Sequence, residues 1–358
     1  MRHGAPDRKE SPRRSHAGRG GFALHRRGGR VFNSELACLG ASQIMSHGPT
    51  KIKTKAICIY CNRAVPDLTD EHIIPLSLGG QHVIQKASCL DCADITKKFE
   101  QDVARDLWGD ARISFDAPSR RKKERPSHIT LSGRNPSDAP LKVAYGEYPA
   151  PMIFYKMPQA GILQGFTHDQ DLSPTWQLVY IADDDKLKKF ATKYPGRLTA
   201  KFRHVPESFG RLIAKIGYGQ MLCSLDPSDF NPICLPYILG AEKNLSYLVG
   251  GRETIAEMLP GTGYSMDSHF FGTSDRGVLV AEIRLFANNG TPTYHVVVGD
   301  VSGAENVNRV KGKMAATYTV DMPAQFDSPR IPPDNLHWMP RVWPLNHWIP
   351  ASKGVNAS

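Results

Sequence analysis

Apolar residues recur at helical spacing in two stretches of the chain. One helix is predicted from Ala93 onward, because its apolar residues follow at intervals of four and form a single stripe. These residues are Ile95, Phe99, Val103 and Leu107. A second helix is predicted over residues 207–225, directly after Pro206. Its apolar face contains Phe209, Leu212, Ile213 and Ile216.

Other stretches have the composition of β-strands. Residues 175–182, TWQLVYIA, predict a strand. Residues 277–286 and 292–300 predict two more, and Asn288-Asn289-Gly290 between them is typical of a hairpin turn. Helices and strands that do not alternate regularly indicate an α+β fold.

Composition divides the chain of 358 residues into unequal parts. The first 43 residues contain nine Arg or Lys and three Asp or Glu, with many glycines, so residues 1–50 are expected to be disordered. This segment could be an arm that binds nucleic acid, or upstream sequence that does not belong to the native protein. We favour the second interpretation, with Met45 as the hypothetical start. The predicted parts are 1–50, a small motif-bearing unit at 51–116, a basic linker at 117–127, a larger α+β domain of unknown role at 128–325, and an irregular tail with Pro and Trp at 326–358.

The net charge and the cysteines indicate the kind of partner and the cellular compartment. The formal net charge of +10 favours a polyanionic partner such as nucleic acid. No run of about 18 apolar residues appears, so no membrane-spanning helix is expected. Four of the seven cysteines form two close pairs, which favours metal binding in a reducing compartment, by default the cytoplasm. Nothing in the sequence indicates the oligomeric state.

Two CxxC pairs predict a structural zinc site. Cys58 and Cys61 form the first pair, and Cys89 and Cys92 form the second. Four thiolates arranged in this way bind Zn²⁺ tetrahedrally and leave no position for a substrate. A small unit without a large core gains folding free energy from such an ion.

The segment TDEHIIPLSLGG, residues 69–80, lies between the two pairs. It predicts a short strand that continues through the two isoleucines and ends in a turn at Pro75 and Gly79-Gly80. With a returning strand and the helix near Ala93, it makes a zinc-stapled ββα unit in which His72 faces the first turns of the helix.

The combination DEHIIP, LGG, ASCLDC and ITKKFE between CxxC pairs resembles the HNH endonuclease family, the ββα-metal nucleases, over roughly residues 55–126. The resemblance implies that His72 is the general base that activates water, a role that suits an imidazole. It also implies that Glu71 helps to hold a divalent cation, Mg²⁺ or Mn²⁺, at the scissile phosphate. Asp70 is expected to be a supporting or turn residue.

The chain departs from the family pattern at two positions. Ala93 stands where many members carry a metal-binding Asn, and Ile84 or Gln85 stands near the place of a second Asn. Thr96 and Glu100 share the helical face of Ala93, within about 60° of it, so either is a candidate to complete the cation site.

Basic residues follow the unit. The run of candidates for phosphate contact is Arg120, Arg121, Lys122, Lys123 and Arg125. A solvated linker is an equal alternative. Lys97 and Lys98, with Arg105 and Arg112, extend the basic face.

The sequence therefore predicts a metal-dependent endonuclease that acts on DNA, with RNA as a possible substrate. A zinc-stabilised nucleic-acid-binding protein without catalytic activity is the alternative. A zinc ribbon of translation or assembly fits less well, because it does not need the Glu71-His72 pair at the end of a strand.

Overall fold

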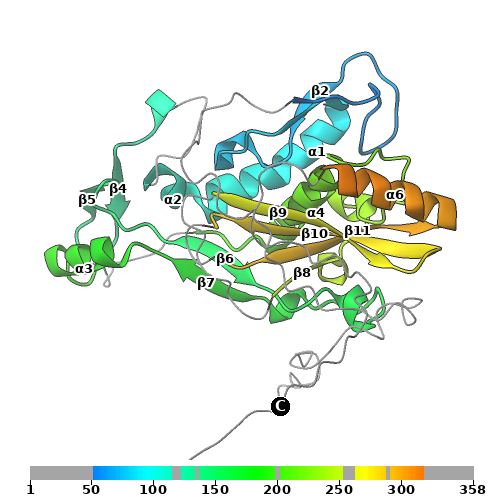
Figure 1. Ribbon diagram of the computed structural model, residues 1–358. Helices are drawn as coiled ribbons and strands as arrows, with labels where there is room; N and C mark the ends of the chain where they lie inside the picture. The colour runs from blue at the N-terminus through cyan, green and yellow to red at the C-terminus, as the bar shows by residue number, and fades with distance from the viewer. Residues whose placement is uncertain are drawn as a thin grey trace, which may run out of the picture. The chain divides into compact units, whose positions relative to one another are not determined.

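The computed structural model describes residues 51–114, 122–133, 137–197, 202–252, 263–287 and 291–317 (Figure 1). The predicted segments 1–50 and 326–358 and the turn Asn288-Asn289-Gly290 lie outside these residues. No helix among the described residues is long and apolar enough to cross a membrane. The helices and strands together make the predicted α+β fold.

The first part of the described chain forms the ββα arrangement predicted from the sequence. Its elements are β1 (Lys51–Ile52), β2 (Thr69–His72), β3 (Val83–Ser88), α1 (Leu90–Gln101) and α2 (Gly109–Ser114). In the three-stranded sheet β3 is central, antiparallel to β2 and parallel to β1. Helix α1 starts three residues before Ala93, and a π-helical stretch, Asp102–Leu107, extends it.

The turn after β2 explains the paired glycines. Strand β2 ends at His72, earlier than predicted, and Gly79 closes a short 3₁₀ turn, Leu76–Leu78, with a φ of 92°. A Cβ on Gly80 would lie 1.9 Å from the carbonyl oxygen of Ile74. Both positions therefore require glycine, one for its backbone conformation and one for space.

The remaining elements form a four-stranded antiparallel sheet and two strand pairs. The sheet has the order β8-β11-β10-β9, and the pairs are β4-β5 and β6-β7. The strands are β4 (His128–Leu131), β5 (Leu141–Ala144), β6 (Met152–Lys156), β7 (Gln177–Ile181), β8 (Val249–Gly251), β9 (Tyr264–Gly272), β10 (Arg276–Leu285) and β11 (Tyr294–Ser302). The helices are α3 (Asp184–Lys193), α4 (Pro206–Met221), α5 (Leu235–Leu239) and α6 (Ala304–Thr317). The strands predicted at 175–182, 277–286 and 292–300 and the helix predicted at 207–225 are confirmed, with shifted ends.

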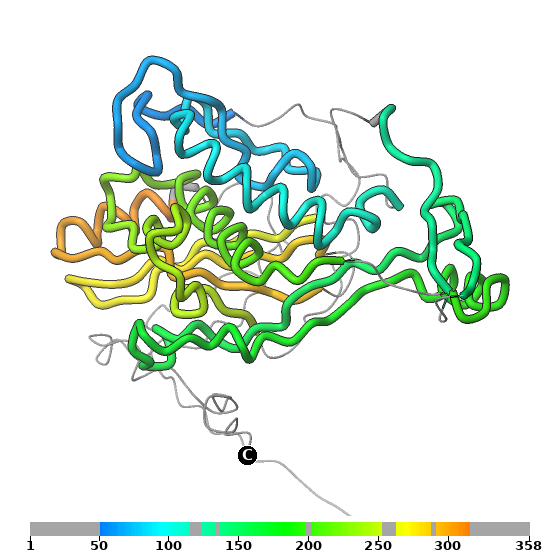
Figure 2. Tube along the Cα trace, turned by 180° about the vertical axis from the view of Figure 1, so that it is seen from behind, coloured from blue at the N-terminus to red at the C-terminus, as the bar shows by residue number. Residues whose placement is uncertain are grey.

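Helix α4 lies between α1 and the four-stranded sheet and contacts both (Figure 2). Two of its glycines allow this close approach. A Cβ on Gly217 would lie 3.0 Å from Val296 of β11, and one on Gly219 would lie 3.2 Å from Ile73. Ile73 and Val296 belong to one continuous hydrophobic cluster, so α4 joins the core of the ββα unit to that of the sheet.

Candidate active site and metal centre

The four cysteines of the CxxC pairs meet in one cluster. Their sulfur atoms all lie within 4.8 Å of one another, and Cys58, Cys89 and Cys92 are buried. The first pair lies in a turn that is closed by a hydrogen bond from the backbone N–H of Asn62 to the carbonyl of Cys58. The second pair lies at the start of helix α1. A tetrahedral metal ion fits this donor set, so the cluster can hold one.

Arg63 supplies positive charge beside the thiols. Its guanidinium donates to Cys61 Sγ at 3.2 Å and to Cys89 Sγ at 3.3 Å, and it is held by Asp91 at 2.6 Å. Burial disfavours the Cys61 thiolate, but the bonds from Arg63 outweigh it and lower the pKa of Cys61 to about 6. Arg63 thus favours the thiolate form that a metal requires.

A cleft of about 590 Å³ lies between β2, the turn that follows it and α1. It brings together the residues predicted for catalysis and for the divalent cation, namely Glu71, His72, Thr96 and Glu100. Asp70 also lines the cleft and accepts a 3.0 Å hydrogen bond from the backbone N–H of Lys86. The β2–β3 ladder is irregular at this position, so Asp70 braces the strand pair, as expected for a supporting residue.

Several predicted basic residues line the same cleft. Lys97 and Arg105 are exposed there, whereas Lys98 is exposed but is not part of the lining. Arg112 is a brace, because its guanidinium donates to the carbonyls of Ser77 at 2.8 Å and Ala104 at 2.9 Å.

The basic run after α2 is described only in part. Arg120, Arg121 and the side chain of Lys122 lie outside the described residues, and Lys123 is exposed. Burial lowers the pKa of Arg112, and the positive charges of Arg125 and Arg105 lower it further. Arg125 is therefore close enough to the cleft to contribute to its positive potential.

Thr96 is a poor ligand in this geometry. Its side chain is buried, and its hydroxyl donates to the carbonyl of Ala93 one turn earlier at 3.1 Å. Threonine commonly makes this bond to its own helix.

Lys215, which the sequence pattern did not single out, contacts the centre of the site from α4. Its side chain is 1% exposed, and its Nζ lies 2.7 Å from Glu71 Oε1 and 2.9 Å from Glu100 Oε1. It also donates to the backbone carbonyls of His72 and of Ile73. The one signal in the sequence was a lysine between Leu212, Ile213 and Ile216, in the most apolar part of the predicted helix.

Lys215 is a charged group in a buried setting. Burial disfavours its ammonium form, but the carboxylates of Glu100 and Glu71 outweigh burial, so the pKa of Lys215 is raised. Burial raises the pKa of Glu71, and the attraction of Lys215 opposes that shift. The three side chains form an ion cluster around a buried ammonium.

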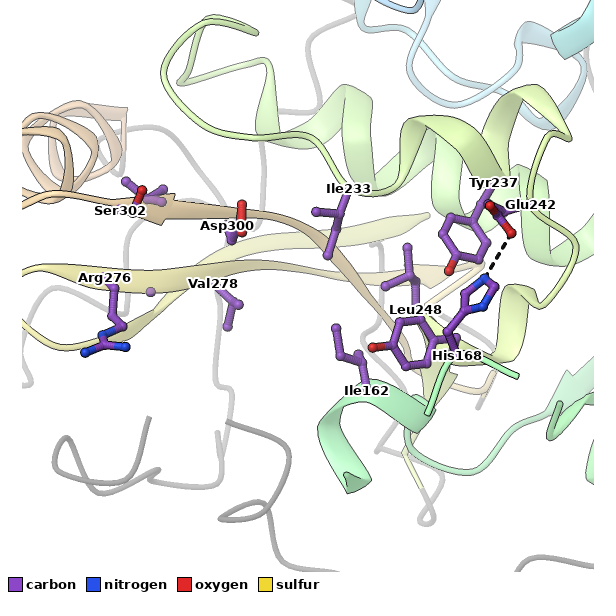
Figure 3. Close-up of a pocket in the computed structure, with 13 residues that line it drawn as sticks. Ile162, His168, Ile233, Tyr237, Glu242, Leu248, Arg276, Val278, Asp300 and Ser302 are labelled. Atoms are coloured by element: carbon purple, nitrogen blue, oxygen red, sulfur yellow. Dashed lines mark hydrogen bonds and ion pairs between the residues drawn. The ribbon is translucent and has the colours of Figure 1, made fainter. Parts of the chain in front are cut away.

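A second cavity, of about 570 Å³, lies beside β10 and β11 (Figure 3). Tyr237, Tyr247 and Leu248 contribute to its lining. His168 and Glu242 pair with each other at 2.9 Å between Nε2 and Oε2. The cavity contains none of the residues predicted for catalysis, so the cleft at His72 is the better candidate for chemistry.

Comparison with protein families identifies the class of the unit. Residues 58–107 match the family described as HNH endonuclease, a range that contains both CxxC pairs, the Glu71-His72 pair and α1. This segment is therefore an HNH endonuclease domain, and the resemblance noted in the sequence is confirmed. Comparisons with curated proteins and with solved structures gave no match.

Proposed function

We propose that the HNH domain hydrolyses phosphodiester bonds of DNA, with His72 as the general base. The observation that carries this proposal is the cleft in which His72 and the exposed cations Lys97 and Arg105 share one lining. Positive side chains there can bind phosphates without reading sequence, which suits DNA and also permits RNA.

His72 has a defined place for this role. It ends β2 opposite Val83 of β3, and the donor that binds its backbone carbonyl is the buried Lys215. An imidazole held at the wall of a cleft can take a proton from water as the water attacks phosphorus. The pairing with β3 and the bond from Lys215 hold the backbone of the base, which supports a fixed geometry for the proton transfer.

We further propose that the thiol cluster holds Zn²⁺. Its donors are four sulfur atoms within 4.8 Å of one another, and Arg63 offsets part of their negative charge. Such an ion is structural, since it would fix the turn at Cys58 and Cys61 against the start of α1.

The divalent cation that HNH nucleases use has no ready place at Glu71, Thr96 and Glu100. Both carboxylates direct an oxygen at Lys215, and the Thr96 hydroxyl is bonded within its helix. Over the part of the chain that the structure describes, the thiols are the only group of three or more His, Cys, Asp or Glu side chains that could hold a metal ion. These three side chains do not fit Mg²⁺ or Mn²⁺ as they stand, and no catalytic step is assigned through such an ion.

Plasmid nicking tests the proposed activity. Zinc-loaded wild type is incubated with supercoiled DNA without added metal, with Mg²⁺ and with Mn²⁺, beside His72→Ala. Removing a general base lowers the rate by about 10²–10⁴-fold, so His72→Ala should be nearly inactive. His128→Ala is a matched control, because His128 is exposed on β4 and bonds Ser127.

The result decides between the two classes of function. Cleavage that persists unchanged in His72→Ala rejects the general base. Absence of cleavage by wild type, with DNA binding retained, favours the binding protein without catalytic activity.

A further inference from the structure

We propose that the ammonium of Lys215 is the resident cation of the Glu71–Glu100 pair, and that this pair consequently does not bind a divalent metal. The inference rests on the proposed function only in treating the cleft as the active site. It goes further by assigning a residue from outside the matched segment 58–107 to the centre of that site.

The hydrogen-bond geometry supports this assignment. Lys215 Nζ has Glu71 Oε1 at 2.7 Å, Glu100 Oε1 at 2.9 Å and the Ile73 carbonyl at 3.3 Å, and it also contacts the His72 carbonyl. An ammonium has three protons and no acceptor, so all of its donors can be used by these oxygens. A lysine bound this completely is part of the site, because withdrawing it would leave a buried charge without partners.

The charges of Glu71, Glu100 and Lys215 support the same assignment. Two carboxylates that direct an oxygen at the same point repel each other unless a cation lies between them, and the buried ammonium of Lys215 is that cation. Mg²⁺ bound to the same carboxylate oxygens would lie about 2.1 Å from them, close beside the ammonium. Like charges at such a short separation in a poorly hydrated site exclude each other.

Packing keeps Lys215 in this position. Helix α4 is fixed on the sheet side by the close approach of Gly217 to Val296, and on the other side by that of Gly219 to Ile73. One turn after Lys215, the hydroxyl of Tyr218 donates to the carbonyl of Ile59 at 2.7 Å, within the first CxxC pair. Helix α4 thus holds the HNH domain at two points, one at the thiol cluster and one at the carboxylate pair.

This makes Lys215 a positioning residue for His72. The ammonium ties the carbonyl of the base, the carbonyl of the next residue and the carboxylate of the preceding residue to one point. The HNH domain therefore depends on the larger part of the chain for the geometry of its own active site.

Manganese binding tests the assignment without reading catalysis. Mn²⁺ is titrated into zinc-loaded, full-length protein and the free ion is measured by electron paramagnetic resonance. Wild type is compared with Glu100→Gln, which removes one carboxylate of the pair, and with Lys215→Met, which removes the ammonium and keeps an unbranched side chain.

If Lys215 is the resident cation, Glu100→Gln leaves the affinity of wild type for Mn²⁺ unchanged within about twofold, and Lys215→Met raises it by about tenfold or more. A loss of about tenfold in Glu100→Gln would overturn the proposal, as would an affinity in folded Lys215→Met no higher than that of wild type. If Lys215→Met does not fold, the comparison of wild type with Glu100→Gln still decides. Neither readout uses DNA cleavage, so failure here is distinct from failure of the nuclease proposal.

Discussion

Two clusters of negative donors lie along α1 and are balanced in different ways. At the start of the helix, Cys89 and Cys92 meet the other two thiols, and the nearby cation is the exposed Arg63. Three turns later, Glu100 meets Glu71 around the fully buried Lys215. The first cluster can take a metal ion from solution, whereas the second already contains a cation of the chain.

The difference shows how neighbouring sites on one helix can use a metal ion from solution in one case and a lysine side chain in the other. Thiolates bind a soft ion such as Zn²⁺ tightly enough for it to stabilise a small fold. Carboxylates bind hard cations that exchange with water, and a lysine on a packed helix replaces such an ion permanently. We expect the first cluster to respond to metal supply and the second to respond to mutation of α4.

The largest expected effect comes from removing a thiol. Cys89→Ser should abolish metal binding and unfold the HNH domain, because structural zinc contributes on the order of 10 kcal/mol to folding in small zinc domains. Zinc content by mass spectrometry and thermal unfolding measure the loss. Cys223→Ser is the control, since Cys223 lies outside the cluster and bonds the Gly219 carbonyl. A full equivalent of zinc retained by Cys89→Ser would contradict the assignment.

The next effect tests the second cluster. Lys215→Met should lower the free energy of unfolding by about 3–5 kcal/mol, because it leaves the buried carboxylate of Glu71 and the partly exposed one of Glu100 without their cation. Lys243→Met is matched to it on the surface, where Lys243 pairs with Glu207 at 3.2 Å, and should cost less than about 1 kcal/mol. Urea denaturation measures both.

The same denaturation experiment includes a rescue. Adding Glu71→Gln and Glu100→Gln to Lys215→Met removes the repelling charges, so stability should partly return. An equal cost for the two lysine variants would mean that Lys215 carries no buried charge.

Removing the cation beside the thiols should have a smaller effect than removing the one between the carboxylates. Arg63→Gln removes the donors to Cys61 and Cys89 and should weaken zinc binding by about 10–100-fold while the fold is kept. Competition with a chromogenic chelator measures the affinity. Arg197→Gln, which loses only a bond to the Ala139 carbonyl, is the control and should bind zinc as wild type does.

The last effect depends on pH and concerns a buried carboxyl with a more distant cation. Burial raises the pKa of Glu282 to about 8, and Arg252, whose Nε lies 3.4 Å away, only partly opposes this. Folding therefore takes up a proton between the unfolded pKa near 4.5 and about 8, so stability falls as the pH rises through this window.

Replacement of Glu282 removes that dependence. Glu282→Gln should match wild type near pH 4.5 and exceed it by up to about 5 kcal/mol above pH 8, because each unit of difference between the unfolded and folded pKa corresponds to about 1.4 kcal/mol; urea midpoints over the range measure the difference. A constant difference at all pH values would show that the Glu282 carboxyl does not titrate in this window.

The parts of the site that sequence predicted are local. The CxxC spacing, the Glu71-His72 pair and the apolar stripe of α1 all lie within 58–107 and follow rules of short range. The same rules put Thr96 and Glu100 on the cleft side of α1, where both line it. These rules do not predict that the Thr96 hydroxyl donates to a carbonyl of its own helix, because the partner of the hydroxyl depends on which other acceptors lie in the cleft.

Lys215 illustrates what local rules cannot provide. It lies 143 residues after His72, and its contact depends on the packing of α4 between α1 and the sheet. The apolar face of α4 was predicted correctly, yet periodicity alone does not say which buried neighbour a lysine on that face will meet. The same limit applies to the π-helical stretch Asp102–Leu107, whose register depends on tertiary contacts.

Anomalous X-ray diffraction tests the contrast between the two clusters most directly. Crystals of the full-length protein are soaked in MnCl₂, and data are collected at the zinc and manganese absorption edges. The account predicts a zinc peak among the sulfur atoms of the four cysteines, and Lys215 Nζ without manganese between Glu71 and Glu100. A manganese peak bonded to both carboxylates, with Lys215 turned away, would contradict it.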